Sequence, residues 1–148
     1  MYDDLAQFKE WWLATRPFKT PKENALSHVA ETHGVVLYRQ DPYQVELFNV
    51  KPNSIIPAHT HPNVDSFEVF VGGDIEFMCD DIWYKQDVIG ASIRVLPSSW
   101  HAGKFGERGG CFLSIQKWQN GVSPKFVGDD WAGTDNSSSY KESRSTDN

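Results

Sequence analysis

Hydrophobic residues near the start of the chain recur at the spacing of an α-helix. Leu5, Phe8 and Trp12 form one apolar stripe, and this spacing predicts a helix over residues 3–15. An aspartate at the start of this segment can cap the first turn, and Pro17 ends the helix.

The pattern then changes to an alternation of apolar and polar residues, which predicts β-strands. The segments with this pattern are Gly34–Tyr38, Tyr43–Val50, Ile55–Ile56, Ser66–Val71, Asp74–Cys79, Ile82–Tyr84, Ala91–Leu96 and Cys111–Trp118. Gly72-Gly73 is a hairpin-type turn signal, and Asp80-Asp81 indicates another turn. Many short strands with closely spaced turns favour an all-β antiparallel sandwich or barrel over an α/β fold.

The last segment of the chain, residues 133–148, has no such pattern. It consists of small and polar residues with a single aromatic residue, Tyr140, so it cannot bury enough surface to offset its ordering entropy. The predicted organisation is therefore a helix and connector over 1–24, one barrel domain over 25–132 and a disordered tail.

The composition of the chain limits which partners it can bind and where in the cell it is expected. The net charge of −6 argues against nucleic acid or an anionic membrane as the main partner, because both favour a basic surface. No apolar run is long enough to span a membrane, and the N-terminus lacks the pattern of a secretion signal. Cys79 and Cys111 lie in apolar alternating stretches and are expected to be reduced. We expect a cytoplasmic protein that handles a small molecule.

The candidate chemistry lies in the histidines. His59 and His61 are two residues apart, so in an extended chain both imidazoles point to one side and can bind a divalent metal. An antiparallel barrel can bring His101 alongside them. Asp65 follows the pair closely and is a candidate fourth ligand through its carboxylate.

At these residues the chain resembles the cupin superfamily. The first cupin motif reads G-x5-H-x-H-x3-E-x6-G, and every interval is kept at Asn53, His59, His61, Asp65 and Gly72. Asn stands at the first Gly place and Asp at the Glu place. The resemblance covers roughly Val45–Trp118 and implies a double-stranded β-helix, which is a jelly-roll barrel with the metal in its mouth.

The second cupin motif reads G-x5-P-x-G-x2-H-x3-N, and its interval from the first Gly to His is kept from Gly90 to His101. The letters inside it differ. Leu96 stands at the Pro place, Ser98 at the second Gly place and Phe105 at the Asn place. The overall length of the motif is therefore kept while its inner residues have changed.

Two acidic residues compete for the place of the fourth ligand. The resemblance assigns it to Asp65, which can reach the metal directly, through water, or through a hydrogen bond to a ligand histidine. Glu68 has the opposite parity on the predicted strand, so it faces away if Asp65 faces inward. A register slip of one residue exchanges the two roles.

Three further residues are candidates for substrate binding. Phe67 is expected to line the cavity or to pack in the core. Arg94 and Gln116 are polar residues in strand patterns, so each could reach into the pocket and bind a carboxylate or carbonyl group, or face solvent. No neighbouring Tyr or Lys indicates a general base, so the catalytic residues are unassigned.

Three histidines and at most one carboxylate leave open positions on a six-coordinate ion, which is what catalysis requires. Nitrogen and oxygen ligands select little among Fe(II), Mn(II), Ni(II), Co(II) and Zn(II), and Fe(II) is preferred only through the reaction that the resemblance implies. The resemblance implies a metal-dependent dioxygenase first and an isomerase or lyase next. The alternative is a non-catalytic cupin that binds a small metabolite or sugar.

Oligomeric state is expected from the same resemblance. Cupins often pair through sheet edges, so we expect a homodimer, and the early strand Gly34–Tyr38 is the candidate edge.

Overall fold

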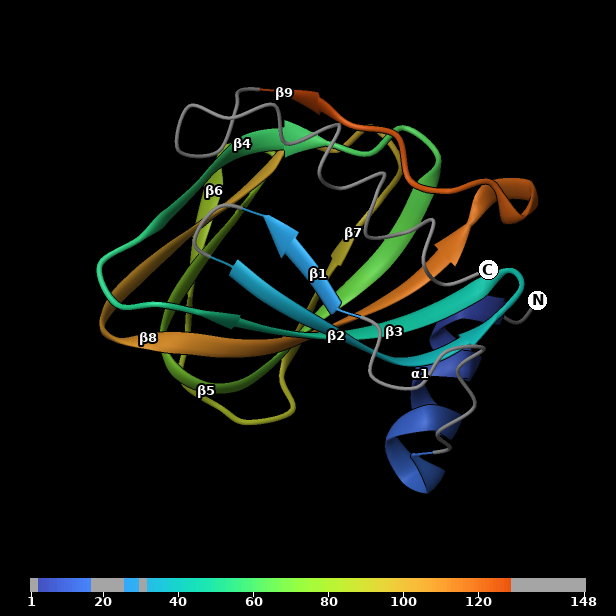
Figure 1. The fold of residues 1–148 in the computed structure, drawn as a ribbon, viewed down its shortest axis with the longest axis horizontal. Coiled ribbons are helices and arrows are strands. Elements are labelled where there is room, and N and C mark those ends of the chain that lie inside the picture. The colour runs from blue at the N-terminus through green and yellow to red at the C-terminus, as the bar shows by residue number, and fades with distance from the viewer. Residues whose placement is uncertain (1–2, 17–25, 30–31, 129–148) are drawn as a thin grey trace.

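The computed structural model describes residues 3–16, 26–29 and 32–128. Its elements are α1 (Asp4–Thr15), β1 (Leu26–Val29), β2 (Thr32–Gln40), β3 (Tyr43–Val50), β4 (Ile55–Thr60), β5 (Val64–Cys79), β6 (Ile82–Gln86), β7 (Ser92–Val95), β8 (His101–Trp118), a 3₁₀ turn (Gln119–Gly121) and β9 (Val127–Gly128). The strands curl into a barrel with α1 outside it (Figure 1). The predicted all-β class with a short N-terminal helix is confirmed. The predicted tail over 133–148 lies outside the described residues.

The long strand β8 organises the barrel. Its second half pairs with β3, its first half pairs with β4, and β5 pairs with it along most of its length. The sheet order is β1-β2-β3-β8-β4-β9, with β6 and β7 attached through β5. All the pairs are antiparallel, which places sequence-distant residues side by side at the barrel mouth.

The structure corrects the predicted hairpin at Gly72-Gly73. Both predicted strands belong to one 16-residue strand, β5, whose register against β8 shifts on either side of the glycine pair. Gly73 has a φ of +93°, and a Cβ there would lie 2.4 Å from the carbonyl oxygen of Gly109. Gly73 therefore allows β5 and β8 to approach closely at this point. The hairpin turn at Asp80-Asp81 is confirmed, with positive φ at both residues.

Two apolar clusters flank the barrel wall. Inside the barrel, one cluster consists of Phe48, Val50, Ile56, Phe70, Ile75, Phe77, Phe105 and Phe112. Outside it, α1 packs against the wall through a cluster made of Leu5, Phe8, Trp12, Tyr38, Val45, Phe67, Val69, Leu113 and Ile115. The inner phenylalanines fill part of the barrel, so the remaining interior space lies towards the histidines.

The helix forms as its periodicity predicts. The carboxylate of Asp3 accepts hydrogen bonds from the backbone N–H groups of Leu5 and Ala6, which caps the first turn. Leu5, Phe8 and Trp12 are the buried residues of the helix. In the part of the chain that the structure describes, no helix is long and apolar enough to cross a membrane.

The candidate sheet edge also needs a correction. The first residues of β2, Thr32–Val35, are covered by β1, while β3 pairs with the opposite side of β2. Gly34 and Val35 therefore lie inside the sheet, and β1 is the terminal strand of the path. The predicted homodimer itself stays a prediction.

Candidate metal centre

The three predicted histidines converge at one end of the barrel. His59 on β4 is the direct cross-strand partner of His101 on β8, and His61 directly follows β4. The ring centroids are 4.2 Å apart for His59 and His101, 5.0 Å for His59 and His61, and 5.4 Å for His61 and His101. One ring nitrogen from each lies within 4.8 Å of those of the other two, a spacing that suits one metal ion.

Backbone carbonyl groups orient all three imidazoles. Nδ1 of His59 lies 2.7 Å from the carbonyl oxygen of Pro57, Nδ1 of His61 2.7 Å from that of Lys125, and Nδ1 of His101 3.0 Å from that of Ser99. A carbonyl oxygen only accepts, so each neutral ring must donate its proton from Nδ1. The lone pair is then on Nε2, which is the tautomer that binds a metal.

Asn63 supports His61 through the chain that follows β8. Its side-chain amide donates to the carbonyl oxygens of Val122 and Ser123 at 3.0 and 2.9 Å, and its Oδ1 accepts from the N–H of Lys125 at 2.8 Å. These bonds fix the segment whose Lys125 carbonyl oxygen orients His61. This role of Asn63 could not be predicted from the sequence, because only the fold brings residue 63 to residues 122–125.

Burial keeps the site in its neutral form. Desolvation, together with the charges of His101 and His61, lowers the pKa of His59 well below its usual range. Desolvation also lowers the pKa of His101. Neutral imidazoles are the form that coordinates metals, so the donor set fits a divalent ion at neutral pH.

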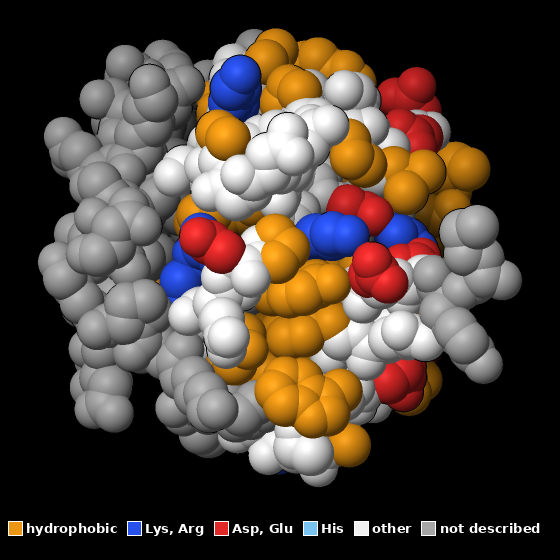
Figure 2. Space-filling model, turned by 90° about the vertical axis from the view of Figure 1, so that its right-hand side faces the viewer, with side chains coloured by type: hydrophobic (Ala, Val, Ile, Leu, Met, Phe, Trp, Pro, Cys, Tyr) orange, Lys and Arg blue, Asp and Glu red, His pale blue; other side chains and the backbone are white. Residues whose placement is uncertain are grey.

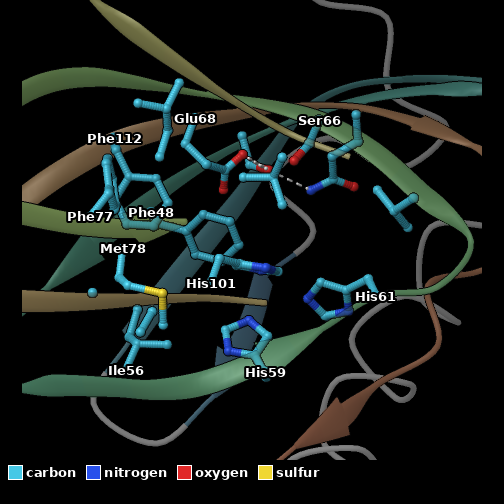
Figure 3. Close-up of a pocket in the computed structure, with 17 residues that line it drawn as sticks. Phe48, Ile56, His59, His61, Ser66, Glu68, Phe77, Met78, His101 and Phe112 are labelled. Atoms are coloured by element: carbon cyan, nitrogen blue, oxygen red, sulfur yellow. Dashed lines mark hydrogen bonds between the residues drawn. The ribbon is translucent and has the colours of Figure 1, made fainter. Parts of the chain in front are cut away.

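The histidines open onto a cavity of about 60 Å³, which has room for roughly four to six water-sized groups. The walls are mainly apolar, and Figure 3 shows Phe48, Phe77, Phe112, Ile56 and Met78 on one side of the histidines. Ser66, Glu68, Ser114 and Gln116 supply the polar side chains. The space therefore fits a small molecule that is bound beside a metal.

The structure corrects the placement of Asp65. Its carboxylate accepts two hydrogen bonds from Arg94, from Nε at 3.1 Å and from Nη2 at 2.6 Å, and Arg94 also pairs with Asp3 at the start of α1. Val64 and Ser66 line the cavity, so the alternation of β5 turns Asp65 to the outer face. Figure 2 shows a face of the molecule on which acidic and basic side chains lie side by side, next to an apolar area.

The three predicted substrate-binding residues also lie on different faces of the barrel wall. Phe67 packs in the outer cluster beneath α1, and Arg94 lies over its ring. Neither residue lines the cavity, whereas Gln116 does. Its role in substrate binding stays a prediction.

Glu68 occupies the inner position that the sequence analysis left as the alternative. It lines the cavity with the three histidines, and its Oε2 accepts a hydrogen bond from Ser114 at 2.9 Å. Its carboxylate is not part of the group of mutually close donors, which among the described residues consists of the histidines alone. Strand parity could have found Glu68 once the register of β5 was known.

The altered motif residues keep the backbone shape of the motif. Asn53 and Ser98 stand where the cupin motifs have glycine, and their φ values are +60° and +66°. Both lie in the left-handed region, which glycine adopts readily and asparagine tolerates better than most residues. The turns before β4 and β8 therefore keep a left-handed backbone conformation although the glycines are replaced.

Comparisons with known proteins bear on the fold. No family model matches the sequence, and no curated protein matches it. Solved structures do match: an RmlC-like cupin from Shewanella frigidimarina is 14% identical, with 68% of this chain and 88% of that chain covered and a TM-score of 0.59.

The fold is that of a cupin. KdgF from Halomonas sp. is 10% identical, with 64% of this chain and 86% of that chain covered and a TM-score of 0.58. An uncharacterized protein with a double-stranded β-helix domain from Klebsiella pneumoniae is 19% identical, with 78% and 98% covered and a TM-score of 0.59. At these identities the similarity establishes the cupin fold, while the activity has to be argued from the site.

Proposed function

We propose that this protein is a metal-dependent cupin enzyme that acts on a small organic molecule, with a dioxygenase reaction on Fe(II) as the first candidate. The observation that carries the proposal is the convergence of His59, His61 and His101 at the cavity wall. One ring nitrogen of each lies within 4.8 Å of those of the other two, and each Nδ1 faces a backbone carbonyl oxygen. Three ligands leave positions for substrate and oxygen on a six-coordinate ion. A bound divalent ion would supply Lewis-acid chemistry and, as iron, the activation of oxygen.

The protein's own groups would bind and orient the substrate. The aromatic and aliphatic walls exclude water from its apolar part, and Ser66 adds a hydroxyl group to the same cavity. Exclusion of water strengthens each of these electrostatic interactions. A small substrate could therefore be positioned by contacts on several sides.

One observation favours a second candidate, an isomerase or lyase. The carboxylate of Glu68 lies in the cavity, and a carboxylate in that place can accept and return a proton during the rearrangement of a carbonyl compound. A third outcome, binding of a small metabolite or sugar without turnover, is also open to this fold.

The test uses the full chain loaded with Fe(II) and incubated in air with an extract of small metabolites, which are then followed by mass spectrometry. His101→Ala serves as the control. A compound that disappears and gains two oxygen atoms supports the dioxygenase. A product of equal mass indicates an isomerase, and two fragments indicate a lyase. A compound that is retained without change indicates a binding protein and contradicts the proposed enzyme.

The proposed homodimer is tested separately. Sedimentation of the purified chain is expected to show twice the mass of one chain, and a monomer across the full concentration range would contradict the dimer.

A further inference from the structure

Glu68 sets the charge of the cavity. Among the described side chains that line it, only Glu68 and the three histidines are titratable, and neither a lysine nor an arginine is present. Glu68 lies outside the group of mutually close metal donors. In Figure 3 it comes from the strand above the histidines and is directed into the same space. A ligand that is held at the histidines and fills this cavity therefore shares it with the Glu68 carboxylate.

A directed series of hydrogen bonds fixes Glu68 as an acceptor. The indole Nε1 of Trp118 can only donate, and it donates to Oε1 of Gln116 at 2.8 Å. This bond orients the amide, so Nε2 of Gln116 donates to Oγ of Ser114 at 3.0 Å. Ser114 then uses its own proton for Oε2 of Glu68 at 2.9 Å. Three alternate residues of β8 thus hold the carboxylate in place.

The carboxylate of Glu68 can accept more than one hydrogen bond. It has about four acceptor sites on its two oxygens, and Ser114 donates to one oxygen, Oε2. The neighbouring walls include Phe48, Ile93 and Phe112. Low polarity around the group strengthens a charge-assisted hydrogen bond and makes the approach of a second anion unfavourable.

We infer that the cavity selects small ligands that bind the metal at one end and carry a hydroxyl or ammonium donor at the other, which donates to Glu68. Ligands with a second carboxylate are disfavoured at this wall. The inference rests on the proposed metal site and adds to it the chemical class of the substrate. It also assigns Glu68 a role in specificity in place of metal ligation.

The test measures the binding of three hydroxamates to the full chain loaded with Co(II). Their hydroxamate group chelates the metal in all cases, and their far ends differ: glycine hydroxamate ends in an ammonium group, glycolohydroxamate in a hydroxyl group and malonic monohydroxamate in a carboxylate. Dissociation constants come from the change in the Co(II) absorption spectrum. The wild-type protein is expected to bind the ammonium and hydroxyl ligands more tightly than the carboxylate ligand.

The variant Glu68→Gln keeps the shape of the side chain and removes its charge. We expect the preference for the ammonium over the carboxylate ligand to fall by about tenfold or more, the usual size of one hydrogen bond to a charged group. The matched control Asp65→Asn removes a charge from the outer face of the same strand and should leave the preference unchanged.

The other outcomes distinguish a failure of the inferred role of Glu68 from a failure of the proposed metal site. Equal preferences in wild type and Glu68→Gln, or tighter wild-type binding of the carboxylate ligand, overturn the inference and leave the metal site intact. Loss of Co(II) from Glu68→Gln alone also overturns it, because Glu68 would then be a ligand. Failure of the wild-type chain to bind Co(II) overturns the proposed function and the inference with it. Where Glu68→Gln does not fold, the wild-type order of affinities decides.

Discussion

His59 and His101 face each other across β4 and β8 with their ring centroids 4.2 Å apart. Protonation of both rings at this distance would place two positive charges together in a buried site. Desolvation, together with the charges of His101 and His61, lowers the pKa of His59, and desolvation lowers the pKa of His101. The pair is therefore neutral in the folded, metal-free protein at physiological pH.

The stability of the metal-free protein should fall as the pH is lowered through about 6.5, the usual pKa of histidine. Below that pH the unfolded chain binds protons at His59 and His101, while the folded chain does not until its lower pKa values are reached. The free energy of unfolding then decreases by at most about 1.4 kcal/mol per pH unit for each histidine.

Urea denaturation at a series of pH values, kept above the range where carboxylates titrate, measures this slope. His59→Gln should show a shallower slope than the wild type, since one of the two histidines is removed. Stability that rises as the pH falls through this window would be inconsistent with buried neutral histidines.

Replacement of Asp65 by asparagine should affect stability and leave metal binding intact. The bond pair to Arg94 is partly exposed, with side-chain exposures of 22% for Asp65 and 31% for Arg94, so we expect the free energy of unfolding to fall by about 1 kcal/mol. Denaturation and metal analysis of the same sample check both parts. A folded Asp65→Asn protein that has lost its metal would restore Asp65 as a ligand.

Removal of the Asn63 side chain should weaken metal binding from a distance. Asn63→Ala releases the segment whose Lys125 carbonyl oxygen orients the ring of His61. Loss of such an outer support usually lowers metal affinity by about 10- to 100-fold. Competition with a chelator of known affinity measures the change, and Asn49→Ala, an exposed position on β3, is the control. Equal affinities in the two variants would exclude the supporting role.

The neighbouring glycines of β5 should respond very differently to substitution. A Cβ at Gly73 would lie 2.4 Å from the carbonyl oxygen of Gly109 in a backbone with positive φ, whereas a Cβ at Gly72 meets nothing within 4 Å. We expect Gly73→Ala to cost about 2 kcal/mol or more of unfolding free energy, and Gly72→Ala about 0.5 kcal/mol or less. Equal costs, measured by denaturation, would contradict the close approach of β5 and β8.

The parts of the fold that depend on local patterns could be predicted from the sequence. The observed bounds of the helix differ from the expected ones by at most one residue, because the apolar stripe and the N-cap that predict them are local features. His59 and His61 share a side because alternate residues of a strand do. The turns before β4 and β8 keep the backbone conformation of the motifs because Asn53 and Ser98 both have left-handed φ values.

The parts that failed depend on contacts between distant strands. The signal at Gly72-Gly73 fits both a turn and a close crossing, and only the approach of Gly109 on β8 decides between them. Asp65 was expected inside because the motif interval was kept, but the register of β5 turns it outward, where Arg94 binds it. A shift of one residue reverses every side chain of a strand, so the inward position of Glu68 could be stated only as an alternative.

The central claim is that His59, His61 and His101 together bind one divalent metal ion. Titration of the metal-free chain with Co(II), followed by its absorption spectrum, tests it directly against His59→Ala, His101→Ala and the control His28→Ala, which lies on β1. We predict one equivalent of Co(II) for the wild type and for His28→Ala, and a large loss of affinity in both site variants. Unchanged stoichiometry and affinity in His59→Ala and His101→Ala would contradict the account.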